Sequence, residues 1–474
     1  MICIKESGAF IGDSGAMRAD LITKYDVRVP RYTSYPTAPH FGPEVESTCY
    51  RRWMSDLDPG EPLSLYLHVP FCHELCWFCG CHTTATRRDR PVAAYAARLA
   101  REIDICADSL ARRARVTHVH WGGGTPTRLA CADFSRIMER LRDRFAVAAD
   151  GEIAVEIDPR QFTPAMARTL ADAGVTRASL GVQDFDPNVQ TAIGRVQSLE
   201  VTESAVEELR AVGITALNLD LMYGLPGQTV ASLEHTVDSA IALAPNRLAL
   251  FGYAHLPDLK RHQRLIDGSR LPDAAARIAQ FEAASARILG HGYRPVGLDH
   301  FARPDDDLIV ALDQGRLRRN FQGYTADRAE ILLGIGASAI SRLPQGYAQN
   351  AVHVRDWSTA IDAGQLPAAR GIAIDDDDRL RGRIIERLMC ELDVDVAEQC
   401  HALGMDPNTL ADAFKALAPL AADGLVRLDG WRVTVPVAAR PFRRLACAAV
   451  DRAGGPQNGP PIEAARASRA APAL

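Results

Sequence analysis

Two adjoining stretches, Leu63-Ser-Leu-Tyr-Leu-His-Val69 and Cys72-His-Glu-Leu-Cys76-Trp-Phe-Cys79-Gly-Cys81, decide how the chain is organised. The first is apolar and alternating, which predicts a buried β-strand. The second places three cysteines at spacings of four and three, so that one loop can wrap a compact cofactor. Iron–sulfur clusters and zinc both bind thiolates. A zinc site would need Cys81 or His82 as a fourth ligand in a strained tetrahedron, so the spacing favours a cluster.

The cysteine loop resembles the signature of the radical S-adenosylmethionine superfamily, Cys-x-x-x-Cys-x-aromatic-Cys, with Phe78 as the aromatic residue. The resemblance implies that Cys72, Cys76 and Cys79 hold three irons of a 4Fe–4S cluster. The fourth iron would stay open to the amine and carboxylate of S-adenosylmethionine. The adjoining Cys81 and the segment Tyr66-Leu-His68-Val-Pro-Phe-Cys72 narrow the resemblance to the oxygen-independent coproporphyrinogen III oxidases, a family of haem biosynthesis.

Composition excludes several other classes of protein. The 474 residues suffice for a large core and two or more domains. Hydrophobic residues make up 47% and charged residues 24%, as in ordinary globular proteins, and the net charge of −5 does not favour nucleic acid or anionic membranes as partners. No apolar run reaches the roughly 20 residues of a membrane span, and no signal peptide is evident. The cysteines number eleven, which is odd, four of them lie within residues 72–81, and they do not look like a disulfide framework. We therefore expect a cytoplasmic protein.

From residue 63 to about 290, short apolar runs alternate with amphipathic segments. The apolar runs predict strands over Leu63–Val69, Thr117–Trp121, Glu152–Ile157, Arg177–Val182, Ala216–Met222 and Leu248–Tyr253. The amphipathic segments predict helices over Val92–Arg112, Ala132–Arg144, Pro164–Ala173, Thr202–Val212, Leu233–Leu243 and Ala274–Leu289. Six such units predict an α/β fold with a parallel sheet and right-handed crossovers. Eight would close a barrel, so we expect an open three-quarter (β/α)6 barrel with functional residues at the C-terminal ends of its strands.

The second predicted strand runs into Gly122-Gly123-Gly124-Thr125-Pro126. Glycines between a strand and a helix let the backbone approach a ligand closely, although a tight turn alone also uses them. At the end of the third strand, Glu156 faces away from its apolar neighbours and is either a salt-bridge partner or a ligand contact. The resemblance favours a ligand site, because the superfamily carries a similar glycine element against the amino group of S-adenosylmethionine.

Three further polar residues follow the fourth and fifth predicted strands. Gln183 follows the fourth strand, and Arg195 lies in the helical region after it. Asp220 sits inside an apolar strand, where an unpartnered carboxylate costs several kcal/mol. Ribose hydroxyls would satisfy it, and Arg195 would bind a methionine carboxylate. The alternative is an internal Asp–Arg pair.

The resemblance to the coproporphyrinogen oxidases extends from about residue 25 to about residue 430. The matching blocks are His120-Trp-Gly-Gly-Gly-Thr-Pro, Glu156-Ile-Asp-Pro-Arg, Gly181-Val-Gln-Asp-Phe, Asn218-Leu-Asp-Leu-Met-Tyr-Gly-Leu-Pro, Tyr253-Ala254-His-Leu-Pro, Asp299-His-Phe-Ala-Arg-Pro-Asp, Arg319-Asn-Phe-Gln322-Gly-Tyr-Thr and Gly336-Ala-Ser-Ala-Ile340-Ser. It implies two S-adenosylmethionine molecules. The residues facing the iron-bound one would be Tyr66, Gly123, Glu156 and Ile340. Those facing the second would be Phe78, Gly124, Thr125, Gln183, Arg195, Asp220 and Ala254, and Cys81 and Gln322 would also belong to the cofactor site.

The implied reaction is the anaerobic oxidative decarboxylation of two propionates, on rings A and B of coproporphyrinogen III, to the vinyl groups of protoporphyrinogen IX. Hydrogen must leave an unactivated carbon, which side-chain acids and bases cannot achieve, so a 5′-deoxyadenosyl radical is required. Tyr66, His68 and Glu156 are the expected catalytic residues. His68 would handle a proton or a carboxylate, or would be a structural imidazole bonded to backbone. We expect a monomer served by a low-potential donor such as flavodoxin or ferredoxin and by an unidentified terminal electron acceptor.

Residues 1–50 are expected to form an N-terminal arm over the active site, with 1–16 disordered and either Met1 or Met17 as the start. The segment Tyr25-Asp-Val-Arg-Val-Pro-Arg31-Tyr-Thr-Ser-Tyr-Pro36 predicts extended backbone. Alone it suggests an arm packed on the surface. The resemblance places it at the mouth of the site, where Arg31 would meet a substrate propionate.

The catalytic domain is expected over residues 51–370 and a mainly helical C-terminal domain over 371–450, followed by a disordered tail over 451–474. Helices are predicted at Leu380–Leu392, Val394–Leu403 and Pro407–Ala422, and Asp429-Gly430 marks a hairpin turn within 424–435. The acidic run Asp375–Asp378 predicts a turn or a helix start rather than a metal site. Helices plus a hairpin are typical of a winged helix, but the lack of a basic recognition helix favours a covering domain over DNA binding.

Two other functions remain open. A haem chaperone related to this family would keep the three-cysteine motif, but such relatives lack the counterpart of Cys81 and are shorter at the start. A radical enzyme acting on another tetrapyrrole would share the barrel and would differ in the arm and in the segment around Gln322. Coproporphyrinogen oxidation is the preferred interpretation.

Overall fold

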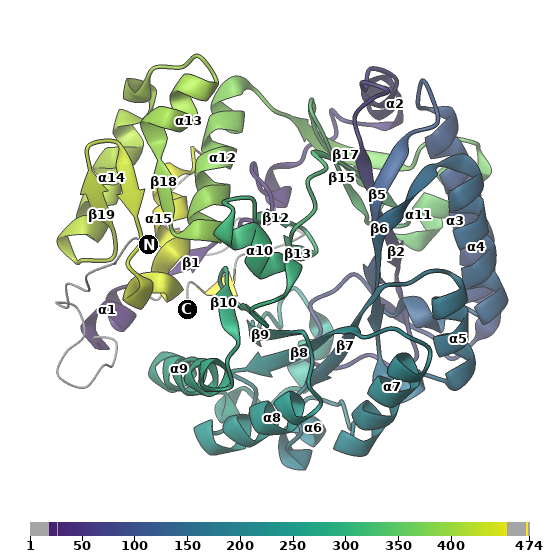
Figure 1. Ribbon diagram of the computed structural model, residues 1–474, viewed down its shortest axis with the longest axis horizontal. Coiled ribbons are helices and arrows are strands. Elements are labelled where there is room, and N and C mark those ends of the chain that lie inside the picture. Colours follow the sequence, from purple (N-terminus) through teal and green to yellow (C-terminus); the bar gives the residue numbers. More distant parts are fainter. Residues whose placement is uncertain (1–18, 26, 453–470, 473–474) are drawn as a thin grey trace.

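A computed structural model describes residues 19–25, 27–452 and 471–472. Its main sheet contains six parallel strands that neighbour one another in sequence order. These are β2 (Leu63–Val69), β5 (Arg115–Gly123), β6 (Ala146–Ile157), β7 (Arg177–Gln183), β8 (Ala216–Tyr223) and β9 (Arg247–Gly252). The helices α3 (Asp89–Asp108), α4 (Cys131–Arg144), α5 (Pro164–Asp172), α6 (Pro187–Ala192), α7 (Leu199–Ala211), α8 (Val230–Ala242) and α9 (Ala274–Gly290) connect them on the outside of the curved sheet (Figure 1).

The sheet is open, because β9 does not pair with β2, and the predicted three-quarter barrel is confirmed. Both of its edges nevertheless extend further than predicted. The strands beyond β2 are β14 (Ile331–Ile335), which is parallel to it, and then the antiparallel β15 (Ile340–Leu343), β16 (Gly346–Asn350) and β17 (Ala368–Ala373). Beyond β9 lie β11 (His300–Ala302) and β10 (Arg294–Val296), also antiparallel.

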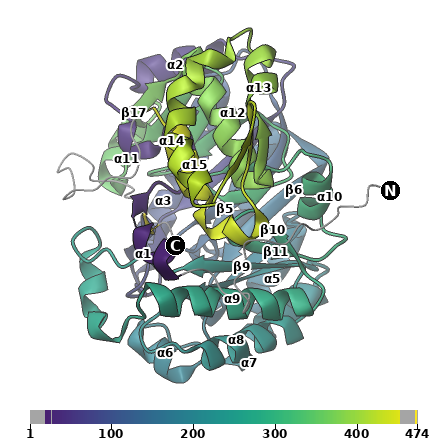
Figure 2. The ribbon, with the colours of Figure 1, turned by 90° about the vertical axis from the view of Figure 1, so that its left-hand side faces the viewer.

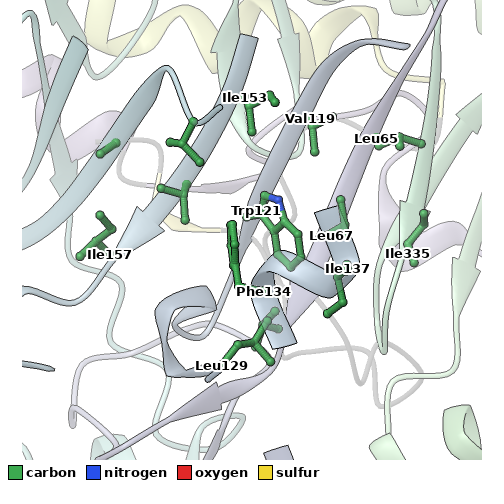
Figure 3. Packing of buried hydrophobic residues seen from close by; sticks show 14 of the residues in the cluster. Leu65, Leu67, Val119, Trp121, Leu129, Phe134, Ile137, Ile153, Ile157 and Ile335 are labelled. Atoms are coloured by element: carbon green, nitrogen blue, oxygen red, sulfur yellow. The ribbon is translucent and has the colours of Figure 1, made fainter. Parts of the chain in front are cut away.

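The outer face of the sheet forms the main apolar core with the helices. Leu65 and Leu67 on β2 and Val119 and Trp121 on β5 lie in this core, and each is at most 1% exposed (Figure 3). The Trp121 ring lies 4.6 Å from that of Phe134 on α4, centroid to centroid. Because side chains alternate along a strand, this packing turns the intervening residues of β2, β5 and β6 toward the inside of the barrel.

The C-terminal domain contains the predicted helices and hairpin, together with elements that were not predicted. The predicted ones are α12 (Asp376–Glu391), α13 (Val396–Ala402), η6 with α14 (Pro407–Leu410 and Ala411–Ala422) and the hairpin β19–β20 (Arg427–Asp429 and Arg432–Thr434). The additions are β18 (Asp393–Asp395) and α15 (Arg443–Val450). Asp375 and Asp378 form a capping box at the start of α12, so the acidic run is a helix start as expected.

The arm packs into the core of the C-terminal domain. Its helix α1 (Ala19–Lys24) and strand β1 (Arg28–Val29) precede a segment whose buried tyrosines, Tyr32 and Tyr35, join the cluster formed by α12, α14 and α15. Figure 2 shows this domain above α9, with α1 beside it. The arm is therefore part of a folded unit and not a loose surface segment.

Three predicted boundaries differ from the observed elements. The boundary at residue 50 falls inside α2 (Ser47–Ser55), and the boundary at 370 falls inside β17. Arg452 forms ion pairs with Asp375, Asp377 and Asp378, so the C-terminal domain extends at least to that residue. Strand β21 (Ala471–Pro472) pairs with β1. The predictions for residues 1–16, for the two possible starts and for most of the tail lie outside the described residues.

The remaining elements are short connections and edge strands. They are β3 (Phe71–Cys72), β4 (Thr84–Ala85), α10 (Asp307–Asp313), β12 (Arg318–Asn320), β13 (Gly323–Thr325), α11 (Val354–Asp362), η1 (Ala38–His40), η2 (Pro126–Arg128), η3 (Pro159–Gln161), η4 (Arg261–Leu265), η5 (Gly268–Arg270) and η7 (Val437–Phe442). Among the described helices, none combines the length and the apolar character needed to cross a bilayer.

Candidate active site

Tyr66 and His68 project from β2 into the barrel and are bonded to each other. The Tyr66 hydroxyl donates to His68 Nδ1 at 3.0 Å, and His68 Nε2 donates to the carbonyl of His82 at 3.1 Å. Burial lowers the pKa of His68, which favours the neutral ring that these two bonds require. The structural alternative for His68 is thus observed, with both ring nitrogens in use, while a catalytic role stays a prediction.

Glu156 lies at the end of β6 on the same inner face, as its alternation with Val155 and Ile157 predicts. Its carboxylate accepts from His120 Nε2 at 3.2 Å and from the Gly123 amide at 3.1 Å. Burial alone raises the pKa of Glu156, but the bond and charge of His120 and the Gly123 amide outweigh it, so the pKa is lowered. The His120 ring stacks on Tyr66 at 5.9 Å. An ionised carboxylate therefore stands beside Tyr66.

The glycine run lets other groups of the site lie against the backbone, because no side chain is in the way. A Cβ atom on Gly122 would lie 2.7 Å from Glu156 Oε1, and one on Gly123 would lie 2.5 Å from His68 Cε1. Gly123 also has φ +113°, which other residues rarely adopt. At Gly124 a Cβ would lie 2.8 Å from the carbonyl of Phe71, just before the cysteine loop. Any side chain here would displace the site, whether or not a ligand touches these glycines.

The three predicted cluster ligands lie in one loop, and each sulfur has hydrogen-bond donors or hydroxyl neighbours. Cys72 Sγ lies 3.2 Å from Thr83 Oγ1 and 3.5 Å from Thr125 Oγ1. Cys79 Sγ accepts from the amide of Cys81 at 3.4 Å. Hydrogen bonds to sulfur stabilise thiolates and tune the potential of iron–sulfur clusters.

The third sulfur, Cys76 Sγ, accepts from two arginines. Arg160 Nη2 and Arg195 Nη1 each lie 3.4 Å from it. In residues 19–25 and 27–452, no three His, Cys, Asp or Glu side chains converge closely enough to hold a single metal ion. A 4Fe–4S cluster does not require this, because each cysteine binds a different iron. The donor set of three thiolates with donors at the sulfurs therefore fits such a cluster.

The two arginines share a single buried carboxylate. Arg195 Nη2 lies 3.2 Å from Asp158 Oδ1, and Arg160 Nη2 lies 2.7 Å from Asp158 Oδ2. Burial raises the pKa of Asp158, but the charges and bonds of both arginines outweigh it and lower the pKa. Arg195 also donates to the carbonyl of Gly181 at 2.7 Å. Arg195 therefore pairs with Asp158 and not with Asp220, the carboxylate for which an internal Asp–Arg pair was the alternative, and Arg195 Nε has no partner among the described residues.

Asp220 lies on β8, and among the described residues no arginine forms an ion pair with it. Its oxygens accept from Asn218 Nδ2 at 2.8 Å and from Ser179 Oγ at 3.2 Å. Burial and then the negative charge of Glu156 raise the pKa of Asp220 to about 6. Gln183 ends β7 with φ +72°, in the left-handed region. Its amide and Arg195 both lie against Gly181, so these two predicted site residues are neighbours.

The other predicted cofactor residues are spread over the cysteine loop, the end of β9, the start of β15 and the turn between β12 and β13. Phe78 packs in a small cluster with Ile193 and Tyr253, and the half-buried Ala254 follows directly. Ile340 begins β15, and Gln322 lies in the turn between β12 and β13. Exposed Cys81 follows the ligand loop. Arg31 lies elsewhere, in a pocket that also contains Tyr253.

Several site residues were not predicted. His120, Asp158 and Arg160 belong to blocks already recognised, and strand alternation was sufficient to place His120 on the inner face. No sequence signal marks the contacts that hold the cysteine loop from η4. There, Gln263 donates to the carbonyl of Phe78 at 3.0 Å, and His262 donates to that of Cys79 at 2.7 Å. Lys260 similarly binds the carbonyl of Cys81 at 3.1 Å.

Two family models match the chain. The model of the radical SAM superfamily matches residues 66–240, which carry the cysteine loop, the glycine run, Glu156, Arg195 and Asp220. The model of the HemN C-terminal domain matches residues 374–442, which include α12 to β20.

Curated relatives cover nearly the whole chain. An oxygen-independent coproporphyrinogen III oxidase from Bradyrhizobium diazoefficiens is 51% identical over 436 residues, which cover 92% of this chain and 97% of that protein. The enzyme of the same name from Escherichia coli is 41% identical, over 91% of this chain and 94% of its own. The solved structure of the E. coli coproporphyrinogen III oxidase, described as a radical SAM enzyme, superimposes with a TM-score of 0.85 at 39% identity, covering 89% of this chain and 97% of that one.

Proposed function

The chain belongs to the family of oxygen-independent coproporphyrinogen III oxidases within the radical SAM superfamily, and we propose that it converts coproporphyrinogen III to protoporphyrinogen IX in haem biosynthesis. Each of two propionates loses a hydrogen atom, one electron and carbon dioxide, which leaves a vinyl group. The hydrogen goes to a radical derived from S-adenosylmethionine and the electron to an acceptor. The observation that carries this proposal is the arrangement of two groups. Three cysteine sulfurs in one loop have hydrogen-bond donors or hydroxyl groups beside them, and the ionised Glu156 accepts from the amide of Gly123 in the adjoining glycine run.

Membership of the superfamily implies a 4Fe–4S cluster and S-adenosylmethionine. Cys72, Cys76 and Cys79 would hold the cluster, which supplies the electron that cleaves the sulfonium of S-adenosylmethionine. Arg160 and Arg195 direct positive charge at Cys76, and Asp158 keeps both guanidiniums in place. These side chains would hold the loop in one geometry when the cluster is bound.

Two molecules of S-adenosylmethionine are part of the proposal. Glu156 has the charge to accept from the amine of the first, with Tyr66, Gly123 and Ile340 around it. Asp220 is suited to ribose hydroxyls of the second, because its two neighbours leave further acceptor positions on its oxygens. The other residues assigned to that molecule are Phe78, Gly124, Thr125, Gln183, Arg195 and Ala254, while Cys81 and Gln322 would contribute to the same site.

His68 is proposed to position Tyr66 rather than to move a proton, since both of its nitrogens are engaged and its pKa is lowered. We further propose a monomer that receives electrons from a flavodoxin or ferredoxin. A cytoplasmic location stays a prediction.

Anaerobic turnover of the cluster-reconstituted protein tests the function. Coproporphyrinogen III, S-adenosylmethionine, a reductant and cell extract as acceptor source would be supplied, and tetrapyrrole products and 5′-deoxyadenosine measured together. Wild type is expected to form the divinyl product, and Cys76→Ala to form neither compound. Cys131→Ala on α4, outside the loop, is the matched control and should behave as wild type.

Other outcomes point to the alternatives. Deoxyadenosine without a vinyl product would keep the radical chemistry and move the substrate to another tetrapyrrole. Neither product from a protein with an intact cluster, together with tight haem binding, would replace the enzyme by a haem chaperone.

A further inference from the structure

A pocket lies where the arm, the C-terminal end of β9, α9 and the C-terminal domain meet. It encloses about 760 Å3 of empty space, including space open to solvent. Four arginines line it, Arg31, Arg277, Arg319 and Arg444, each from a different segment of the chain. Such a concentration of one charge in a half-open pocket points to an anionic ligand.

The guanidinium of Arg319 is the clearest sign of a missing partner. Its Nε and Nη1 atoms are buried, and neither has a hydrogen-bond partner among the described residues. The group instead lies over the ring of Tyr324, 4.5 Å from its centroid. Buried donors on a charged group are costly to leave unpaired, so native proteins satisfy almost all of them. A carboxylate in the pocket would supply what Arg319 lacks.

Two further arginines are also unpaired. Within the described part of the chain, neither Arg31 nor Arg277 has a carboxylate at salt-bridge distance, and Arg277 lies 5.8 Å from the ring centroid of Tyr223. The lining contains one acidic residue, Asp299, whose carboxylate accepts from His300 Nδ1 at 2.7 Å. Positive charge therefore exceeds negative charge in the pocket by a wide margin.

The walls between the arginines are apolar. Leu250, Phe251, Phe281 and Leu298 line them, together with the ring of Tyr253. Such a surface suits a large flat or puckered ring, while separated guanidiniums suit carboxylates at its rim. A tetrapyrrole that carries several propionates has this combination of properties.

The pocket adjoins the proposed reaction site. Gly252 and Tyr253 line it, and the next residue is Ala254, which is assigned to the second S-adenosylmethionine. On the other side, the charge of His300 reaches Asp220 on β8, and His300 is bonded to Asp299 of the pocket lining. A ring held in the pocket would therefore extend a side chain toward the ends of β8 and β9.

We propose that Arg31, Arg277 and Arg319 bind propionates of the tetrapyrrole, with Arg444 completing the charge of the pocket. This proposal rests on the proposed function and names the part of the molecule that selects its substrate. Affinity then follows the number of carboxylates. The product, which has lost two of its four propionates, binds more weakly than the substrate and leaves.

Binding of coproporphyrin III, the stable four-propionate porphyrin, to the cluster-reconstituted protein tests the proposal by fluorescence quenching under anaerobic conditions. Arg319→Gln and Arg277→Gln are each expected to weaken binding at least tenfold, since a charge-assisted bond contributes about 1.5–3 kcal/mol. The tetramethyl ester, which lacks charge, should bind wild type as weakly as it binds the variants. Arg303→Gln removes an exposed arginine that follows β11, at the opposite end of β9, and should change nothing.

Turnover of the same proteins separates this proposal from the proposed function. If wild type forms the divinyl product while the arginine variants bind and turn over as wild type does, the pocket is not the propionate site and the function stands. If wild type forms no such product, the function itself fails. Unchanged 5′-deoxyadenosine formation without substrate would show that a variant has kept its cluster, so that weakened porphyrin binding supports the pocket.

Discussion

Two groups of arginines are built into this molecule in different ways. Beside the cysteine loop, Arg160 and Arg195 share the buried carboxylate of Asp158 and donate to a sulfur. In the pocket at β9, Arg319 and Arg277 have aromatic rings beside them but no carboxylate at bonding distance among the described residues. The first group has its carboxylate within the protein and holds structure, although Arg195 Nε has no partner among the described residues. The second group is incomplete and is arranged for a ligand.

The largest expected effect on stability comes from the first group, beside the cysteine loop. Asp158→Ala leaves two buried guanidiniums without their carboxylate, and we expect it to lower the free energy of unfolding by about 3–5 kcal/mol. Urea denaturation followed by tryptophan fluorescence measures it. Asp313→Ala, which removes the partner of Arg294 from an exposed pair, should cost less than about 1 kcal/mol. Equal losses in the two variants would contradict the comparison.

The next effect concerns Asp220. The charge of Glu156 raises its pKa, and the charge of His300 lowers it. If its ionised form binds ribose, affinity for S-adenosylmethionine must rise with pH through about 6 and then level off. One unit below the pKa only about a tenth of the group is ionised, so affinity at pH 5 should be roughly tenfold lower than at pH 7.5. Equilibrium binding across this range measures the profile, and Asp220→Asn should abolish this step. The same slope in that variant would exclude Asp220 as its origin.

A third effect has the opposite sign to the first. Arg319→Met keeps the stem that packs on Tyr324 and removes the unpaired charge, so the free energy of unfolding should not fall and should rise by about 1 kcal/mol. Its neighbour Arg318 pairs with Glu330 and Glu386, so Arg318→Met should destabilise the protein by about 1–3 kcal/mol. Thermal or urea unfolding of both variants provides the measurement. If Arg319→Met is as destabilising as Arg318→Met, Arg319 has a partner within the protein.

The smallest effect is expected at η4. Gln263→Ala removes its bond to the carbonyl of Phe78, together with the bond that its Oε1 accepts from the Leu256 amide. The bond to the loop contributes about 1 kcal/mol, so a chelator should remove iron from the reconstituted protein a few times faster. The decay of the visible absorbance of the cluster reports this rate. Arg264→Ala on the same turn is the control, because the Arg264 side chain bonds to the carbonyl of Pro257 and pairs with Asp258. Identical rates of iron loss for the two variants would show that the bond from η4 does not stabilise the cysteine loop.

Sequence periodicity was sufficient to predict the barrel, because its six units are regular and their outward residues are apolar. It was not sufficient for the added strands. In β16 all five residues are buried although they include Gln349 and Asn350, and their burial depends on partners far away in sequence. Asn350 donates to Glu102 on α3 at 2.7 Å, a contact that no local pattern contains.

The residues of the candidate site likewise divide into those that could be placed from the sequence and those that could not. Tyr66, His68 and Glu156 could be placed on one face by alternation within short strands, and the structure brings them together. Arg195 could not be assigned a partner, because Asp158 and Cys76 approach it only through the fold. The arginine pocket was even less accessible to prediction, since its four arginines come from distant segments and only Arg31 and Arg319 stood in recognised motifs.

The shared core of the arm and the C-terminal domain sets an order of events during synthesis. Tyr32 and Tyr35 are made about 345 residues before α12, on which they pack, which is roughly 20–70 s at 5–20 residues per second. The segment that holds the three cysteines emerges early in that interval, whereas Arg319 arrives late in it and Arg444 only after it. Nascent and truncated chains therefore contain the cysteine loop, which would generate the radical, before they contain the complete pocket, which would bind the substrate.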